Sequence, residues 1–150
     1  MLLEHQPESL TIGETVICFA HEYLKVPEGI LVGQPLRLDV FQQAFIVSVL
    51  DNKVLTRTAI LSIARRNGKT FVLGVLCLAY LIGPLARQNS NIASAAQSRE
   101  QAALLFALIV KMVQMSEEIQ PLVHIIPSSK KIVSLATGSE YAALSAETKS

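Results

Sequence analysis

The sequence contains no tryptophan, only 5% aromatic residues and only two cysteines among 150 residues. Cys18 and Cys77 are far apart and lie within apolar stretches. A disulfide scaffold is therefore excluded, and both residues are expected to be reduced thiols in the core, as in cytosolic proteins. A net charge of +1 excludes a general electrostatic attraction to nucleic acid, so DNA binding would need a local patch.

Long apolar runs and targeting signals are also scarce. The N-terminal residues lack the basic region and apolar core of a secretory signal. The longest uncharged stretch, residues 71–86, lies between Lys69 and Arg87 and contains Gly83-Pro84 near its end. A membrane-spanning helix needs about 20 residues. This stretch therefore predicts a buried helix and no membrane span.

The chain is nevertheless 51% apolar, which is typical of a buried sheet covered by helices. Apolar spacing and turn residues predict helices and strands that alternate along most of the chain. Capping boxes at Thr11 and Ser98 mark two of the helix starts. The predicted order is helix 12–25, helix 39–50, strand 57–63, helix 69–86, strand 91–95, helix 98–115 and strands 123–126 and 132–135. This order predicts an α/β fold with parallel strands at the centre of the sheet.

A possible phosphate-binding loop follows the predicted strand 57–63. Its second half, Gly68-Lys69-Thr70, matches the usual pattern, although Ile63 stands where the first glycine is expected. Gly68 would let the backbone approach phosphates, Lys69 would reach the β- and γ-phosphates, and the Thr70 hydroxyl would hold Mg²⁺. The loop predicts a P-loop NTPase-like three-layer sandwich with a mainly parallel sheet.

The alternative is a Gly-Lys-Thr turn that merely starts a helix. Arg65 and Arg66 argue against it, because with Lys69 they place three cations within five residues, with no acid close by in the sequence. Clustered cations at a buried loop are costly unless an anion neutralises them. A bound triphosphate would be such an anion.

This variant loop, with Arg65 four residues before Lys69, resembles that of the large terminase subunits, the DNA-packaging motors of tailed bacteriophages. The likeness continues outside the loop, over about residues 12–150. It is carried by residues 24–29, by residues 33–38 with Gln42, by residues 93–102 and by residues 137–146. Because these segments occur in the family's order, the resemblance is specific.

The resemblance implies ATP and Mg²⁺ as cofactors and gives roles to single residues. Arg65 and Lys69 would be catalytic, with Arg65 stabilising charge on the γ-phosphate, and Thr70 would hold the metal. Gln42 would contact adenine, the alternative being an exposed helix residue. The nucleotide-binding set implied is Gln42, Arg65, Arg66, Asn67, Gly68, Lys69 and Thr70. Arg66 could instead face solvent or a neighbouring subunit, and Asn67 would contribute only its backbone amide.

The resemblance also implies domains and partners. Residues 1–35 would form an N-terminal helix and the segment leading into the nucleotide site, and residues 36–150 the amino-terminal part of a P-loop ATPase domain. The fold would be incomplete, without the Walker B strand and the nuclease domain. The partners implied are double-stranded DNA, a small terminase subunit and a portal protein, with a possible homo-oligomer of the full-length phage or prophage protein in the host cytoplasm.

Two other functions stay open at this point. The chain could be a truncated, catalytically inactive nucleotide-binding or interaction fragment, because its only adjacent acids, Glu117 and Glu118, are expected at the solvated end of a helix. It could also be an unrelated P-loop enzyme such as a kinase or helicase. The missing first glycine and the long match outside the loop argue against the latter.

Overall fold

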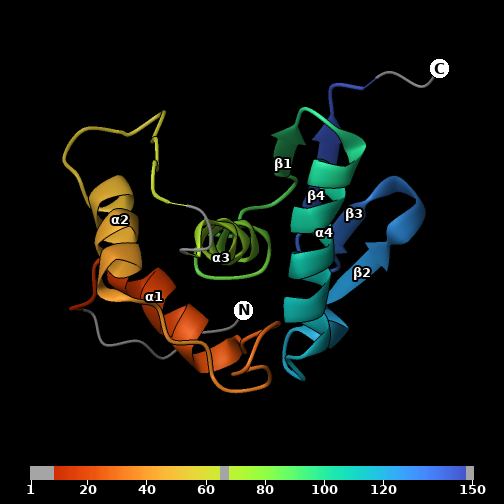
Figure 1. The fold of residues 1–150 in the computed structure, drawn as a ribbon. Helices are drawn as coiled ribbons and strands as arrows, with labels where there is room; N and C mark the ends of the chain where they lie inside the picture. The colour runs from red at the N-terminus through yellow and green to blue at the C-terminus, as the bar shows by residue number, and fades with distance from the viewer. Residues whose placement is uncertain (1–8, 65–67, 148–150) are drawn as a thin grey trace.

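The computed structural model describes residues 9–64 and 68–147. Within these residues, helices precede the first strand, and the strands follow in the second half of the chain (Figure 1). The elements are α1 (Ile12–Tyr23), α2 (Val40–Leu50), α3 (Lys69–Leu81), β1 (Asn91–Ala96), α4 (Arg99–Gln114), β2 (Val123–Ile126), β3 (Lys131–Ser134) and β4 (Glu140–Ser145), with 3₁₀ turns η1 (Gln120–Leu122) and η2 (Pro127–Ser129) flanking β2.

The four described strands form a mixed sheet in the order β1-β4-β3-β2. Only β1 and β4 are parallel, in register from Asn91↔Glu140 to Ala96↔Ser145. The other two pairs are antiparallel, so the predicted mainly parallel sheet is wrong. The reason is the length of the connections: β2, β3 and β4 are joined by short turns, and a parallel pair needs a crossover of a dozen or more residues.

The predicted strand over residues 57–63 is also wrong, because the described residues in this segment form neither helix nor strand. The segment runs on the far side of α3 from the sheet (Figure 1). A strand needs a neighbour for its backbone hydrogen bonds, and none lies there in the described chain. Ile60, in the middle of the segment, is 86% exposed.

The helix starts predicted from capping boxes are confirmed. The Thr11 hydroxyl accepts from the Glu14 amide at 3.2 Å, and the Thr11 amide donates to the Glu14 carboxylate at 2.9 Å. At α4, the Ser98 hydroxyl accepts from the Gln101 amide at 3.2 Å. These bonds satisfy amides that a helix leaves without partners in its first turn.

Helix α3 starts where the sequence predicted but ends at Leu81 and not at residue 86. The chain turns at Gly83, whose amide donates to the Leu78 carbonyl at 3.1 Å, and Pro84 has no amide to continue the helix. The helix is also only partly buried, since Leu73 is 49% and Tyr80 42% exposed. No helix in the described part of the chain is long and apolar enough to cross a membrane.

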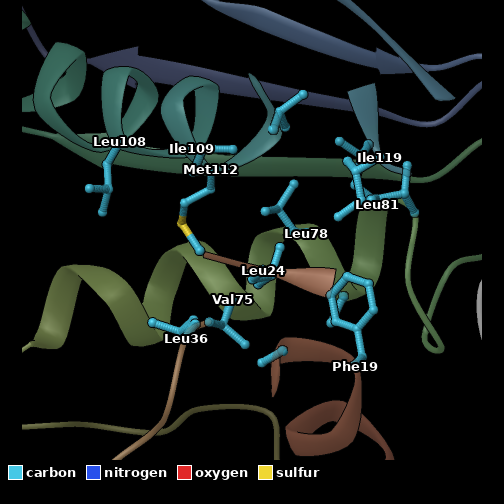
Figure 2. Close-up of a cluster of buried hydrophobic side chains, with 14 of the residues drawn as sticks. Phe19, Leu24, Leu36, Val75, Leu78, Leu81, Leu108, Ile109, Met112 and Ile119 are labelled. Atoms are coloured by element: carbon cyan, nitrogen blue, oxygen red, sulfur yellow. The ribbon is translucent and has the colours of Figure 1, made fainter. Parts of the chain in front are cut away.

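Helix α3 lies between α1 and α2 on one side and α4 with the sheet on the other (Figure 1). Figure 2 shows Val75 and Leu78 of α3 among side chains from α1 and α4. At Gly74, a Cβ atom would lie 3.0 Å from the Met112 sulfur and 3.7 Å from Ile109 Cγ1. A larger residue there would require the Met112 side chain to shift by a few tenths of an ångström, so Gly74 allows α3 and α4 to pack closely.

Both cysteines are free thiols, as the sequence predicted. Cys77 lies on α3 and packs against the core. Burial raises the pKa of its thiol to about 11. Because the thiolate is the reactive form, Cys77 is a structural residue and not a nucleophile.

Candidate functional site

The N-terminus of α3 carries the residues of the predicted phosphate loop. Gly68 is the N-cap and adopts the left-handed conformation, with φ of 79°. Within the described residues, no side chain caps this helix, and its first turn contains no acid. The Lys69 amine donates to the Ile63 carbonyl at 2.8 Å, which links the start of α3 to the segment that precedes it. Thr70 is exposed. The helix end thus presents free amides and a cation together.

Gln42 of α2 reaches this loop directly. Its Nε2 donates to the Gly68 carbonyl at 3.3 Å. A Cβ atom on residue 68 would lie 2.4 Å from the same nitrogen, so Gln42 or the loop would have to shift to admit any residue other than glycine. Gln42 is 6% exposed, so its interpretation as an exposed helix residue is wrong.

The oxygen of the Gln42 side-chain amide is also held by a hydrogen bond. This atom, Oε1, accepts from the Asp39 amide at 2.8 Å, in the first turn of α2. The neighbouring Gln43 donates from Nε2 to the Leu38 carbonyl at 2.8 Å. These bonds fix the end of the lead-in loop, residues 24–38, against the start of α2. The amide of Gln42 is therefore oriented before any ligand binds.

Two cavities meet at Gly68 and Phe71. The Lys69 cavity, of about 660 Å³, is lined by Glu28, Gly29, Gly68, Lys69, Thr70, Phe71, Leu104 and Leu108. The Gln42 cavity, of about 290 Å³, is lined by Val26, Leu36, Arg37, Leu38, Asp39, Phe41, Gln42, Gly68 and Phe71. Both volumes are of the order found for small-molecule sites, about 300–1,000 Å³. One cavity offers a cation at a helix N-terminus, and the other offers aromatic rings with an oriented amide.

A salt bridge that the sequence did not predict involves Glu28, one of the residues that line the Lys69 cavity. Glu28 in the lead-in loop accepts from the Lys111 amine of α4 at 2.6 Å. Both side chains are about half exposed, at 52% and 50%. The pair joins segments 83 residues apart, so no local pattern could have revealed it. Lys111 also offsets the negative charge that Glu28 brings to a cavity containing Lys69.

Three of the predicted site residues, Arg65, Arg66 and Asn67, lie outside the described residues. Their roles stay predictions. The structure does bring together Gln42, Gly68 and Lys69, with Thr70 lining the same cavity. These residues come from two helices that are separated in the sequence by the exposed segment 51–64.

No group of three or more His, Cys, Asp or Glu side chains that could hold a metal occurs within residues 9–64 and 68–147. Glu117 and Glu118 follow the end of α4 and are exposed, and the Glu118 carboxylate accepts from the Ser116 hydroxyl at 3.3 Å. Neither lines the Lys69 cavity. Two residues that line this cavity offer oxygen atoms of the kind that Mg²⁺ binds: Thr70 through its hydroxyl and Glu28 through its carboxylate.

A third cavity, of about 440 Å³, lies near the other end of α3. We call it the Tyr80 cavity. It contains two cations and several apolar side chains but shares no residue with the other two. Its lining is Ile12, Val49, Leu50, Asn52, Lys53, Val54, Leu55, Thr56, Tyr80, Pro84, Leu85, Ala86 and Arg87. Because it is separate from the other two cavities, a ligand that binds at the start of α3 should leave it unchanged.

Comparison with known proteins identifies what the chain is similar to. No family model matches it. The chain is 54% identical over 140 residues to the large subunit of the terminase of Enterobacteria phage HK97, a match that covers 93% of this chain and 28% of that protein. The crystal structure of the HK97 bacteriophage large terminase matches with a TM-score of 0.87 and 52% identity, over 94% of this chain and 29% of that one. The chain thus spans less than a third of its relative's length. Over that stretch, its predicted resemblance to the large terminase subunits of tailed bacteriophages is confirmed.

Proposed function

We propose that this chain binds ATP with Mg²⁺ at the N-terminus of α3, as part of a phage DNA-packaging motor. One observation carries the proposal. The start of α3 has no side-chain cap among the described residues, and it opens on a cavity lined by Lys69 and Thr70. In α1 and α4, by contrast, Thr11 and Ser98 satisfy the first-turn amides.

The phosphates occupy the Lys69 cavity. The amides at the start of α3 point their hydrogens out of the helix, where the helix dipole also favours negative charge. Gly68 lets the backbone approach the anion closely. The Lys69 amine exchanges its bond to the Ile63 carbonyl for bonds to phosphate oxygens, which are stronger because both partners are charged. Glu28 stays neutralised by Lys111.

The base occupies the Gln42 cavity. Phe41 and Phe71 line it and offer aromatic surface for a purine ring. Gln42 uses Oε1 once and Nε2 once in the present contacts. An amide has two donor hydrogens and two acceptor lone pairs, so one of each is left for a base. Adenine presents the matching acceptor and donor side by side at N7 and N6.

The Thr70 hydroxyl and phosphate oxygens would hold Mg²⁺. Mg²⁺ prefers oxygen ligands and is usually bound in part by substrate phosphates. When bound, the ion neutralises charge on the β- and γ-phosphates. Arg65, as the resemblance implies, adds positive charge at the γ-phosphate.

The wider assignment rests on the relative. The relative is named as the large subunit of a terminase. The resemblance implies a motor that couples ATP hydrolysis to translocation of double-stranded DNA. We propose that the chain corresponds to the amino-terminal part of the ATPase domain, with P-loop architecture. A small terminase subunit and a portal protein would be the partners of the complete protein, in the host cytoplasm.

Replacing Lys69 by alanine is expected to weaken nucleotide binding by about 10- to 150-fold. That range corresponds to the loss of hydrogen bonds between charged groups. The measurement is a titration of the chain with a fluorescent ATP analogue in the presence of Mg²⁺. Thr70→Ala, in the same titration, should reduce the effect of Mg²⁺ more than the affinity measured without the metal.

The matched control is Lys53→Ala, which removes an exposed lysine from the Tyr80 cavity. It should leave the affinity unchanged. Equal affinity of the wild-type chain and Lys69→Ala would contradict the assignment of the phosphate site.

A further inference from the structure

His21 of α1 holds the lead-in loop through a hydrogen bond that only neutral histidine can make. Its Nε2 accepts from the Leu38 amide at 3.1 Å. A protonated imidazole has no free lone pair at Nε2 and cannot accept. Leu38 is 5% exposed, so its amide would find little water to replace this acceptor. Protonation of His21 therefore leaves a buried donor without a partner, which is costly.

From Leu38, a short chain of hydrogen bonds leads to the phosphate loop. The next residue, Asp39, donates its amide to Gln42 Oε1 at 2.8 Å. Gln42 Nε2 then donates to the Gly68 carbonyl at 3.3 Å. A shift of Leu38 therefore displaces the Asp39 amide, the donor that orients Gln42 toward the Gly68 carbonyl. None of the residues that link His21 to the phosphate loop lies on α1, the helix that carries His21.

We propose that His21 is a positioning residue for the nucleotide site: its neutral imidazole holds the lead-in loop so that Gln42 meets Gly68 and the base, and its protonation loosens this arrangement. The inference rests on the proposed nucleotide binding. It adds a residue that does not itself line either cavity, and it makes affinity depend on pH.

The surroundings of His21 favour its neutral form. Burial, and then the nearby positive charge of Arg37, lower the pKa of His21 below its usual 6.5. Helices α2 and α3 both pack against α1, and α2 carries no titratable side chain between Asp39 and Asp51. The other titratable groups on the neighbouring elements are Glu14, Cys18, Glu22 and Tyr23 of α1, Lys25, Glu28 and Arg37 of the lead-in loop, and Lys69, Cys77 and Tyr80 of α3.

Because the pKa of His21 is lowered in the folded chain, the contact is stable at neutral pH and is lost in acid. The folded chain binds the His21 proton less readily than the unfolded chain, so this contact contributes fully above pH 6.5. Its contribution is lost as the pH falls below 6.5 through the lower pKa of the folded state. Nucleotide affinity should fall in the same range, because the Leu38 bond is lost there.

The test is the affinity for a fluorescent ATP analogue at a series of pH values from about 7.5 down to about 5, because the pKa of His21 lies below its usual value. We expect the wild-type affinity to fall about two- to tenfold at the lowest pH, the range one hydrogen bond provides. His21→Gln, whose amide oxygen can accept from Leu38 at every pH in the series, should keep the affinity and lose this pH effect. His21→Leu, without an acceptor, should be weak throughout the series. His124→Gln, at an exposed histidine of β2, should behave as wild type.

A second readout, taken without nucleotide, separates this inference from the proposed function. The NMR resonance of the Leu38 amide should shift as the His21 ring titrates, and should not do so in His21→Gln. If it shifts while the nucleotide affinity stays constant, the positioning role is overturned and the nucleotide site stands. If Leu38 does not respond, the inference is overturned regardless of affinity. If the wild-type chain binds no nucleotide, the proposed function fails first and this inference with it.

Discussion

Replacing Gly68 by alanine should lower nucleotide affinity by about 5- to 30-fold while leaving the chain folded. The residue adopts φ of 79°, a conformation that costs about 1–2 kcal/mol for a residue with a Cβ atom. The added methyl would also lie 2.4 Å from Gln42 Nε2. Either the loop or Gln42 must move, and both cavities share Gly68. The measurement is the same ATP-analogue titration, with circular dichroism to confirm folding.

Gly33→Ala separates strain from the contact with Gln42. Gly33 has φ of +85°, but its Cβ would meet no atom within 4 Å. The substitution Gly33→Ala should therefore lower the free energy of unfolding and leave the nucleotide affinity unchanged. In a Gln42→Ala background, Gly68→Ala should cost less affinity than in the wild-type chain, because the clashing amide is gone. Strictly additive effects of the two substitutions would show that the contact does not matter for binding.

Replacing Ile109 by alanine should lower the free energy of unfolding by about 2–5 kcal/mol, the usual cost of removing a buried isoleucine side chain to the β-carbon. Ile109 is fully buried on α4 and faces Gly74 of α3. Domains are stable by only about 5–15 kcal/mol, so this one change removes a large share of the total. Urea denaturation followed by circular dichroism measures it.

Ile60→Ala is the matched control, because the same side chain is 86% exposed there. It should change stability by no more than about 0.5 kcal/mol. A similar loss at both positions would mean that the segment around Ile60 is buried in solution. A negligible loss at Ile109 would contradict the packing of α4 against α3.

Local signals predicted the helices well. The capping residues Thr11 and Ser98 and the acid Asp39 mark the starts of α1, α4 and α2 within one residue of the structure. These signals act over three or four residues, so the sequence shows them directly. The end of α3 was less predictable, because an uncharged run continues beyond Leu81 while the chain already turns at Gly83.

The strands were harder because their partners lie far away in the sequence. Residues 57–63 carry a strand-like apolar pattern but have no described neighbour to pair with. Conversely, β4 was not predicted, since its alanines and serine have little β propensity. It is nevertheless held by β1, 49 residues away at Asn91↔Glu140, and by the bond between the Tyr141 and Ser94 hydroxyls at 2.7 Å.

In the candidate site, too, the local features were predictable from the sequence and the contacts between distant residues were not. The Gly-Lys-Thr pattern placed Gly68, Lys69 and Thr70 at a helix start, as the structure has them. The placement of Gln42 near the nucleotide site came from the resemblance, and its bond to Gly68 had no sequence signal. The contribution of His21 could not be predicted either, because it depends on how α1 faces the lead-in loop.

The central claim is that phosphates bind at the start of α3 and the base beside Gln42. Mapping backbone amide shifts by NMR tests it most directly, with Mg²⁺ and tripolyphosphate, adenosine or ATP as separate ligands. Tripolyphosphate should shift the amides of residues 68–71, adenosine those around Gln42, and ATP both sets. Shifts confined to the Tyr80 cavity, with no change at residues 68–71, would contradict the account.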